Sequence, residues 1–191
     1  MKSRIERAFD ATRFSHVSFA DKELHVVDYT ERTASVRSVE VHNTKPTDID
    51  SLTIHNPTEL SISTSIFTSH SFFDENSYEP KQCECIMTPT ALSPDSFVLF
   101  IEIKDCKPKN VSDYHKEVKE KVLKNVRFFR DKGILKNNKV VYAVISFPRK
   151  DKTNFHNHLI KATEWKQIRD KHKIMIKGTN EITIKNEKSI V

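Results

Sequence analysis

The first half of the chain carries short segments in which apolar and polar positions alternate or apolar residues run together. Such segments are typical of β-strands, because successive side chains leave a strand on opposite faces. We predict strands over residues 16–20, 23–29, 33–42 and 59–68. A short amphipathic helix is predicted over residues 2–12, and a loop is predicted over residues 70–81.

The second half of the chain combines apolar strands with helical patterns. Residues 96–104 are apolar on both faces, which predicts a central strand covered on both sides. A helix is predicted over residues 113–132, with Ser112 as its N-cap and Gly133 just after its end. The remaining predicted elements are strands over residues 83–88 and 139–148, a helix over 155–170, and a hairpin of strands 173–176 and 181–184 around Gly178.

This order of elements predicts an α/β fold (α+β in a stricter scheme). Because the long helix links two buried strands, those strands are expected to pair in parallel within a central mixed β-sheet, with helices on its faces. Residues 1–56 are expected to form a strand-rich N-terminal extension packed on a core of residues 57–191, which ends in a helix and a hairpin.

Composition narrows the class of protein. The chain has 191 residues, enough for one well-packed domain. It contains no stretch of roughly 18–20 apolar residues, so no membrane span is predicted, and its N-terminus lacks the apolar segment of a secretory signal. Three cysteines form no even disulfide framework, which favours a reducing, cytoplasmic location. The only glycines are Gly133 and Gly178, so the sequence contains no phosphate-binding glycine loop.

The net charge is +6, and it is unevenly distributed. Residues 61–103 hold one lysine against six acidic residues, whereas residues 104–152 hold fifteen lysines and arginines against six. An acidic segment followed directly by a basic one suits a metal site beside a surface that binds a polyanion. A solvated, lysine-rich helix explains the same charges equally well, so charge alone does not decide between the two.

Glu102 and Lys104 close the apolar strand and, two residues apart, leave it on the same face. If residues 90–95 form the turn to the preceding strand, opposed residue numbers sum to about 185–186, and Glu84 lies across from Glu102. Two facing carboxylates are destabilising unless a cation lies between them, and a divalent metal is the natural candidate. Lys104 would then position or help to deprotonate the attacking water.

Residues 57–150 resemble the core of the PD-(D/E)XK nuclease superfamily. That family places an acidic residue on one strand and (D/E)-x-K on the next, followed by a helix and a further strand. Here ECIMTP, FVLFIEIKD, the predicted helix and VVYAVISFP follow in that order. The letters Pro94-Asp95 complete the family's name, but about seven residues of extended strand, on the order of 23 Å, separate Asp95 from Glu102. Asp95 is therefore predicted to be a turn residue.

The resemblance implies a restriction-endonuclease-like core that hydrolyses phosphodiester bonds with Mg²⁺ or Mn²⁺, in DNA rather than RNA. It assigns Glu84 to the first acid, which is usually Asp, and Glu102 to the second. The carbonyl of Ile103 becomes a backbone metal ligand and Lys104 the catalytic lysine. Stand-alone nucleases of this family are typical of phage defence and mobile elements.

Three lysines that follow the site are predicted to contact phosphates, because cations near the scissile bond hold the nucleic acid backbone. They are Lys107, Lys109 and Lys121. A second hypothesis is a catalytically silent nuclease-like domain that binds nucleic acid or a partner subunit, with the strand-rich first 55 residues as its interface. The residues themselves do not distinguish DNA from RNA, endo- from exonuclease action, or a homodimer from a partner subunit, and they give no sequence preference.

Two other constellations are weaker. Cys83-x-Cys85 with Cys106 has the wrong spacing for zinc, and both strand cysteines are expected to face the apolar side, opposite Ile103 and Ile101. His156-x-His158 lies on a predicted helix, which would point the two side chains apart.

Overall fold

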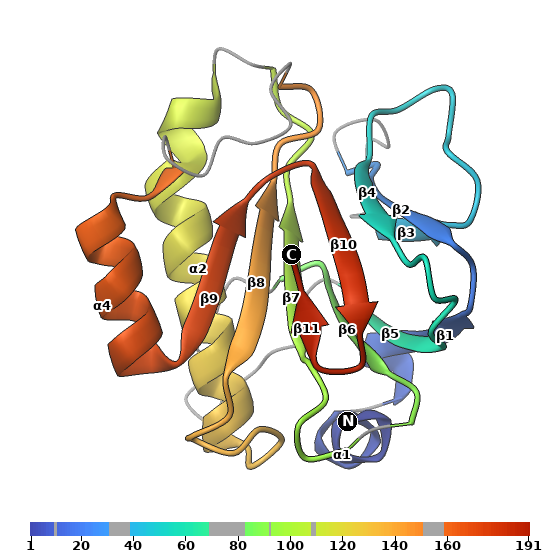
Figure 1. The fold of residues 1–191 in the computed structure, drawn as a ribbon. Helices are drawn as coiled ribbons and strands as arrows, with labels where there is room; N and C mark the ends of the chain where they lie inside the picture. The colour runs from blue at the N-terminus through green and yellow to red at the C-terminus, as the bar shows by residue number, and fades with distance from the viewer. Residues whose placement is uncertain (10, 31–38, 69–82, 92, 108–109, 151–158) are drawn as a thin grey trace.

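A computed structural model describes the chain except for residues 10, 31–38, 69–82, 92, 108–109 and 151–158. The described residues form a mixed α/β fold with two mixed β-sheets and three α-helices (Figure 1). The helices are α1 (Lys2–Ala8), α2 (Val111–Asp131) and α4 (Ala162–His172), and a 3₁₀ turn, η1, spans Ala11–Arg13.

The larger sheet has six strands. In spatial order they are β1 (Phe14–Phe19), β5 (Ile62–Phe67), β6 (Cys85–Pro89), β7 (Leu99–Ile103), β8 (Val141–Ser146) and β9 (Ile174–Gly178). Neighbours from β1 to β7 are antiparallel, whereas β8 runs parallel to β7 and β9 parallel to β8. Parallel neighbours need a crossover connection, and α2 provides it between β7 and β8. The predicted mixed sheet is confirmed.

The smaller sheet combines strands from both ends of the chain. Its order is β11 (Ser189–Ile190), β10 (Glu181–Asn186), β4 (Leu52–His55), β2 (Glu23–Asp28) and β3 (Val39–His42). β10 pairs with β4 in parallel, and the other pairs are antiparallel. Strands from either side of residue 56 therefore share both sheets, because β1 also pairs with β5 in the larger one.

Both faces of the larger sheet are buried, as the doubly apolar β7 predicts. On one face Phe100 packs with Val122 and Phe129 of α2. On the other, Ile101 packs with strands of the smaller sheet, such as Leu24 and Ile182. The layers are helix, sheet and sheet (Figure 1), so the prediction of helices on both faces holds for one face only. The second face is covered by β2, β4 and β10, each of which needs a partner for its apolar side.

The predicted C-terminal hairpin is wrong, since β9 and β10 lie in different sheets. Asn180, buried in the connection between them, explains the change of sheet. Its side-chain Nδ2 donates to the Phe147 carbonyl at 2.8 Å, and its Oδ1 accepts from the Phe147 N–H and the Ser146 hydroxyl at 2.9 Å. These bonds fix the connection at the end of β8 and turn the chain toward the smaller sheet.

Other boundaries shift by a few residues. α2 begins at Val111 with Asn110 as its N-cap, so the predicted N-cap Ser112 lies inside the helix. Gly133 follows the end of α2 with φ +67°, as predicted for a helix C-terminus. The predicted helix over residues 2–12 ends at Ala8, and the short strand β4 is not foreseen. The predicted loop 70–81, residues 33–38 and residues 155–158 lie outside the described residues.

Candidate active site

Glu84 and Glu102 face each other across the β6–β7 pair. Cys85 pairs with Ile101 and Met87 with Leu99, a register in which opposed residue numbers sum to 186. The Glu84 N–H, just before β6, also donates to the carbonyl of Ile101 at 3.0 Å, a bond that shifts the register there by one residue, to a sum of 185. This register is the one predicted from the sequence. Both side chains lie on the side of the sheet that carries α2, because both carboxylates contact Lys121 of that helix.

A cation does lie between the two carboxylates, and it is the ammonium group of Lys121 from α2. Its Nζ is 3.1 Å from Glu84 Oε1 and 2.6 Å from Glu102 Oε1. The side chains of Lys121, Glu84 and Glu102 are 12%, 4% and 2% exposed. Facing carboxylates need a positive neighbour, and this charge-assisted arrangement provides one inside the protein. Lys121, predicted to contact phosphates, is directed at the two acids in this structure.

Asn125, one helical turn after Lys121, holds α2 against the start of β6. It is fully buried, and its Oδ1 accepts the backbone N–H of Cys83 at 2.8 Å. Its Nδ2 donates to the carbonyl of Lys121. Because this one side chain bonds to the backbone of both Cys83 and Lys121, it holds Lys121 close to Glu84, which follows Cys83. Sequence reasoning missed Asn125, although a polar residue at the spacing of Val118 and Val122 is a signal that it needs a partner.

Lys104 leaves β7 on the same face as Glu102, at the edge of this cluster. Its Nζ lies 5.3 Å from the centre of the Tyr114 ring in the first turns of α2, a cation–π contact. Its backbone N–H donates to the carbonyl of Ser146 at 3.0 Å, which keeps the end of β7 beside the end of β8. Ile103 is the last residue of β7, and its side chain packs in the core on the other face of the sheet. It could therefore offer a metal only its backbone carbonyl.

The residues that follow the parallel strands add further charge to this end of the sheet. Asp105 is 2% exposed, and its Oδ1 lies 3.7 Å from Nε of Arg149, which follows β8. Lys107 is exposed to solvent, and Lys109 lies outside the described residues. Ligands of open α/β sheets bind at the carboxyl ends of the parallel strands, which is where these groups gather.

Asp95 lies elsewhere. It is exposed in the turn that precedes β7, where the Ser96 N–H donates to the carbonyl of Ser93, whereas Glu102 is next to the last residue of β7. The interpretation of Asp95 as a turn residue is confirmed.

The cysteines show one correction. Cys85 packs with Ile101 and Ile103 as predicted, but Cys83 lies in the core on the α2 side, because β6 begins only at Cys85. All three cysteines are buried thiols. His156 and His158 lie outside the described residues. Within the described part of the chain, no group of three or more His, Cys, Asp or Glu side chains is placed to hold a metal.

A divalent metal nevertheless fits the donor set of Glu84 and Glu102. One oxygen from each carboxylate converges on a single cationic atom, and both donors are hard oxygens. Mg²⁺ is commonly bound by one or two carboxylates and keeps several waters, so it does not need a third acidic side chain. No helix among the described residues is long and apolar enough to cross a membrane. No family model, curated protein or solved structure matches the chain.

Proposed function

We propose that this protein is a metal-dependent nuclease of the PD-(D/E)XK type. The observation that carries the proposal is the convergence of the Glu84 and Glu102 carboxylates on one cation, with Lys104 directly after β7 and beside Tyr114 of α2. The order β6, β7, α2 and β8 supports a restriction-endonuclease-like core around that site. We further propose a cytoplasmic role on DNA rather than RNA, in phage defence or a mobile element.

Each residue has a defined task in this proposal. Glu84 and Glu102, with the carbonyl of Ile103, hold Mg²⁺ or Mn²⁺, which supplies Lewis-acid polarisation of the scissile phosphodiester when bound. Lys104 orients the attacking water, and Lys107 and Lys109 hold the backbone phosphates. Lys121 gives up its place between the acids to the metal, which its long, flexible side chain permits.

Lys121 also favours a second function. Its ammonium already bonds to both carboxylates within the fold, so each acid has a cationic partner without a metal. Under this second function the domain is catalytically silent and binds nucleic acid or a partner subunit.

Cleavage assays separate the two. Wild type, Lys104→Ala and Glu102→Gln are incubated with plasmid, linear duplex, single-stranded DNA and RNA in Mg²⁺ or Mn²⁺, with Lys124→Ala, an exposed lysine of α2, as matched control. The nuclease proposal expects wild type and Lys124→Ala to cut and both site variants to lose at least about 100-fold in rate. If Glu102→Gln still cuts like wild type, the proposed active site is wrong. Cutting of no substrate by any variant, together with unchanged Mn²⁺ binding in Glu102→Gln, favours the silent domain.

A further inference from the structure

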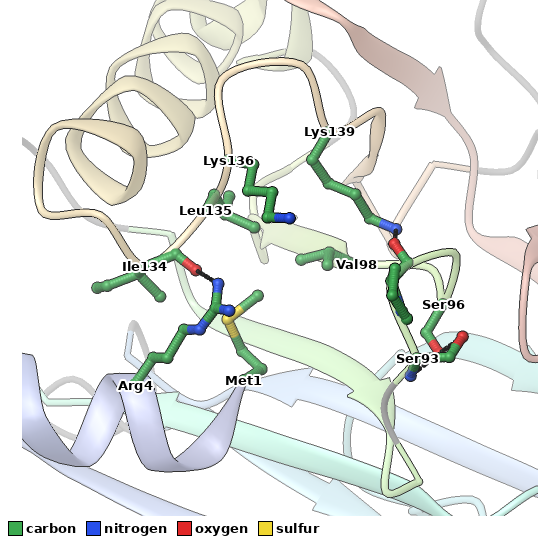
Figure 2. Close-up of a pocket in the computed structure, with 10 residues that line it drawn as sticks. Met1, Arg4, Ser93, Ser96, Val98, Ile134, Leu135, Lys136 and Lys139 are labelled. Carbon is green, nitrogen blue, oxygen red and sulfur yellow. Dashed lines mark hydrogen bonds between the residues drawn. The ribbon is translucent and has the colours of Figure 1, made fainter.

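A cavity of about 250 Å³ (Figure 2) lies beside the start of β7, at the end of the strand opposite Glu102. It lies between α1, the turn that precedes β7 and the loop that follows α2. Its apolar lining includes Val98, Ile134 and Leu135, together with Met1 and Pro94. Among the described residues that line it, three have cationic side chains and none is acidic. They are Arg4, Lys136 and Lys139.

The cationic groups come from two sides of this cavity. Figure 2 shows Arg4 rising from α1, while Lys136 and Lys139 come from the loop after α2. An Arg4 guanidinium nitrogen donates to the carbonyl of Ile134 at 3.1 Å, and Lys139 Nζ donates to the carbonyl of Pro94 at 2.7 Å. These bonds hold the two cations in place across the cavity.

Donors remain for a ligand. A guanidinium carries five N–H groups and an ammonium three, and each of the bonds above uses one. Lys136 is exposed, and its ammonium reaches over Leu135 in Figure 2. Burial lowers the pKa of Lys139, and the charge of nearby Asp95 only partly opposes this effect. A partly desolvated cation beside apolar surface is stabilised by an anion that brings its own apolar body.

We infer that this cavity binds a small organic anion, in which an aromatic or aliphatic body carries one carboxylate or phosphate. The body packs on Val98, Ile134 and Leu135, and the anionic group lies among Arg4, Lys136 and Lys139. The size agrees, since a cavity of roughly 150 Å³ holds benzene, and 250 Å³ leaves room for one anionic substituent. This site is independent of the proposed nuclease centre at the other end of β7.

Ligand binding by the full chain tests the inference. Benzoate and phenyl phosphate distinguish a carboxylate from a phosphate. Benzyl alcohol lacks the negative charge, benzylamine carries a positive charge instead, and inorganic phosphate lacks the aromatic ring. Binding is followed by NMR shifts of residues around the cavity. We expect at least one of the two organic anions to bind with a Kd on the order of 1 mM or tighter.

A charge reversal supplies the decisive comparison. Lys136→Glu changes an exposed side chain and is expected to weaken binding of the organic anion at least about tenfold, whereas Lys124→Glu on α2 leaves it unchanged. The inference is overturned if neither organic anion, at a concentration of about 10 mM, shifts the NMR signals of these residues. It is also overturned if benzyl alcohol or inorganic phosphate binds as tightly as the organic anions, or if Lys136→Glu binds them like wild type.

Discussion

Replacing Lys121 with methionine tests what the ammonium group does between Glu84 and Glu102. Methionine keeps most of the length and apolar surface of the lysine stem, so the substitution removes mainly the charge and its two hydrogen bonds. The two glutamate side chains, 4% and 2% exposed, then face each other with no ammonium between them. Removing one partner of a buried ion pair costs roughly 3–5 kcal/mol, and we expect a loss in this range.

Urea unfolding in EDTA measures this loss, with fluorescence of the single tryptophan, Trp165, as the probe. For a chain of this length, a loss of 1 kcal/mol in the free energy of unfolding lowers the melting temperature by roughly 2–4 °C. In thermal unfolding, the melting temperature of Lys121→Met should therefore fall by roughly 6–20 °C. Lys124→Met, at an exposed position three residues further along α2, is the matched control and should stay within about 0.5 kcal/mol of wild type.

Adding Mn²⁺ extends the test to the metal. If Mn²⁺ takes the position of the ammonium, it should restore stability to Lys121→Met and stabilise that variant more than wild type. A free concentration of about 100 times the Kd contributes about 2.7 kcal/mol. Equal stability of Lys121→Met and Lys124→Met in EDTA refutes the claim that Lys121 balances the buried acids. If Lys121→Met is destabilised but Mn²⁺ does not restore its stability, the claim about the ion pair stands and the proposed metal site is refuted.

Three further predictions concern the surroundings of the site and the fold. Asn125→Ala should lose roughly 2–4 kcal/mol in urea unfolding, because it leaves the Cys83 N–H buried without its acceptor; equal stability to wild type contradicts the proposed tether. Gly133→Ala should cost about 1 kcal/mol from its positive φ alone, since an added Cβ meets no atom within 4 Å, and thermal unfolding measures it. Burial lowers the pKa of His25 from its ordinary 6.5, opposed in part by Glu23. The unfolded chain therefore binds this proton more readily, so stability should fall as pH drops below 6.5, and the fall should be shallower in His25→Gln.

The sequence predicts the centre of the fold better than its periphery. The doubly apolar strand 96–104, its turn and the helix that follows it predict the β6–β7 register and the β7–β8 crossover, because these contacts are local or follow from one connection. The smaller sheet is different. Its strand β10 comes from the far end of the chain, and the four residues Leu52–His55 of β4 give little periodicity. Alternation shows that such strands have an apolar face but not which surface covers it.

The candidate site divides in the same way. The facing of Glu84 and Glu102 follows from strand register, which the spacing of residues in a turn fixes. The place of Lys121 depends on how α2 lies over the sheet, which no local pattern specifies. A signal was present nonetheless: Lys121 and Asn125 lie three and seven residues after Val118, on the stripe that α2 buries. Polar residues on such a stripe require partners, and for Lys121 these partners are the two nearby acids, Glu84 and Glu102.

This arrangement relates metal affinity directly to the ion pair. In the proposed nuclease, a metal held by Glu84 and Glu102 would compete with the ammonium, which already bonds to one oxygen atom of each carboxylate, Glu84 Oε1 and Glu102 Oε1. If a metal takes these oxygen atoms, its binding breaks both bonds to Lys121, and its affinity is then weaker than that of the carboxylate pair alone by the free energy of that step. A nuclease tolerates this cost if substrate phosphates receive the displaced ammonium, since they offer it new anionic partners. Under that condition metal and nucleic acid bind cooperatively, and a metal titration without DNA understates the affinity of the working site.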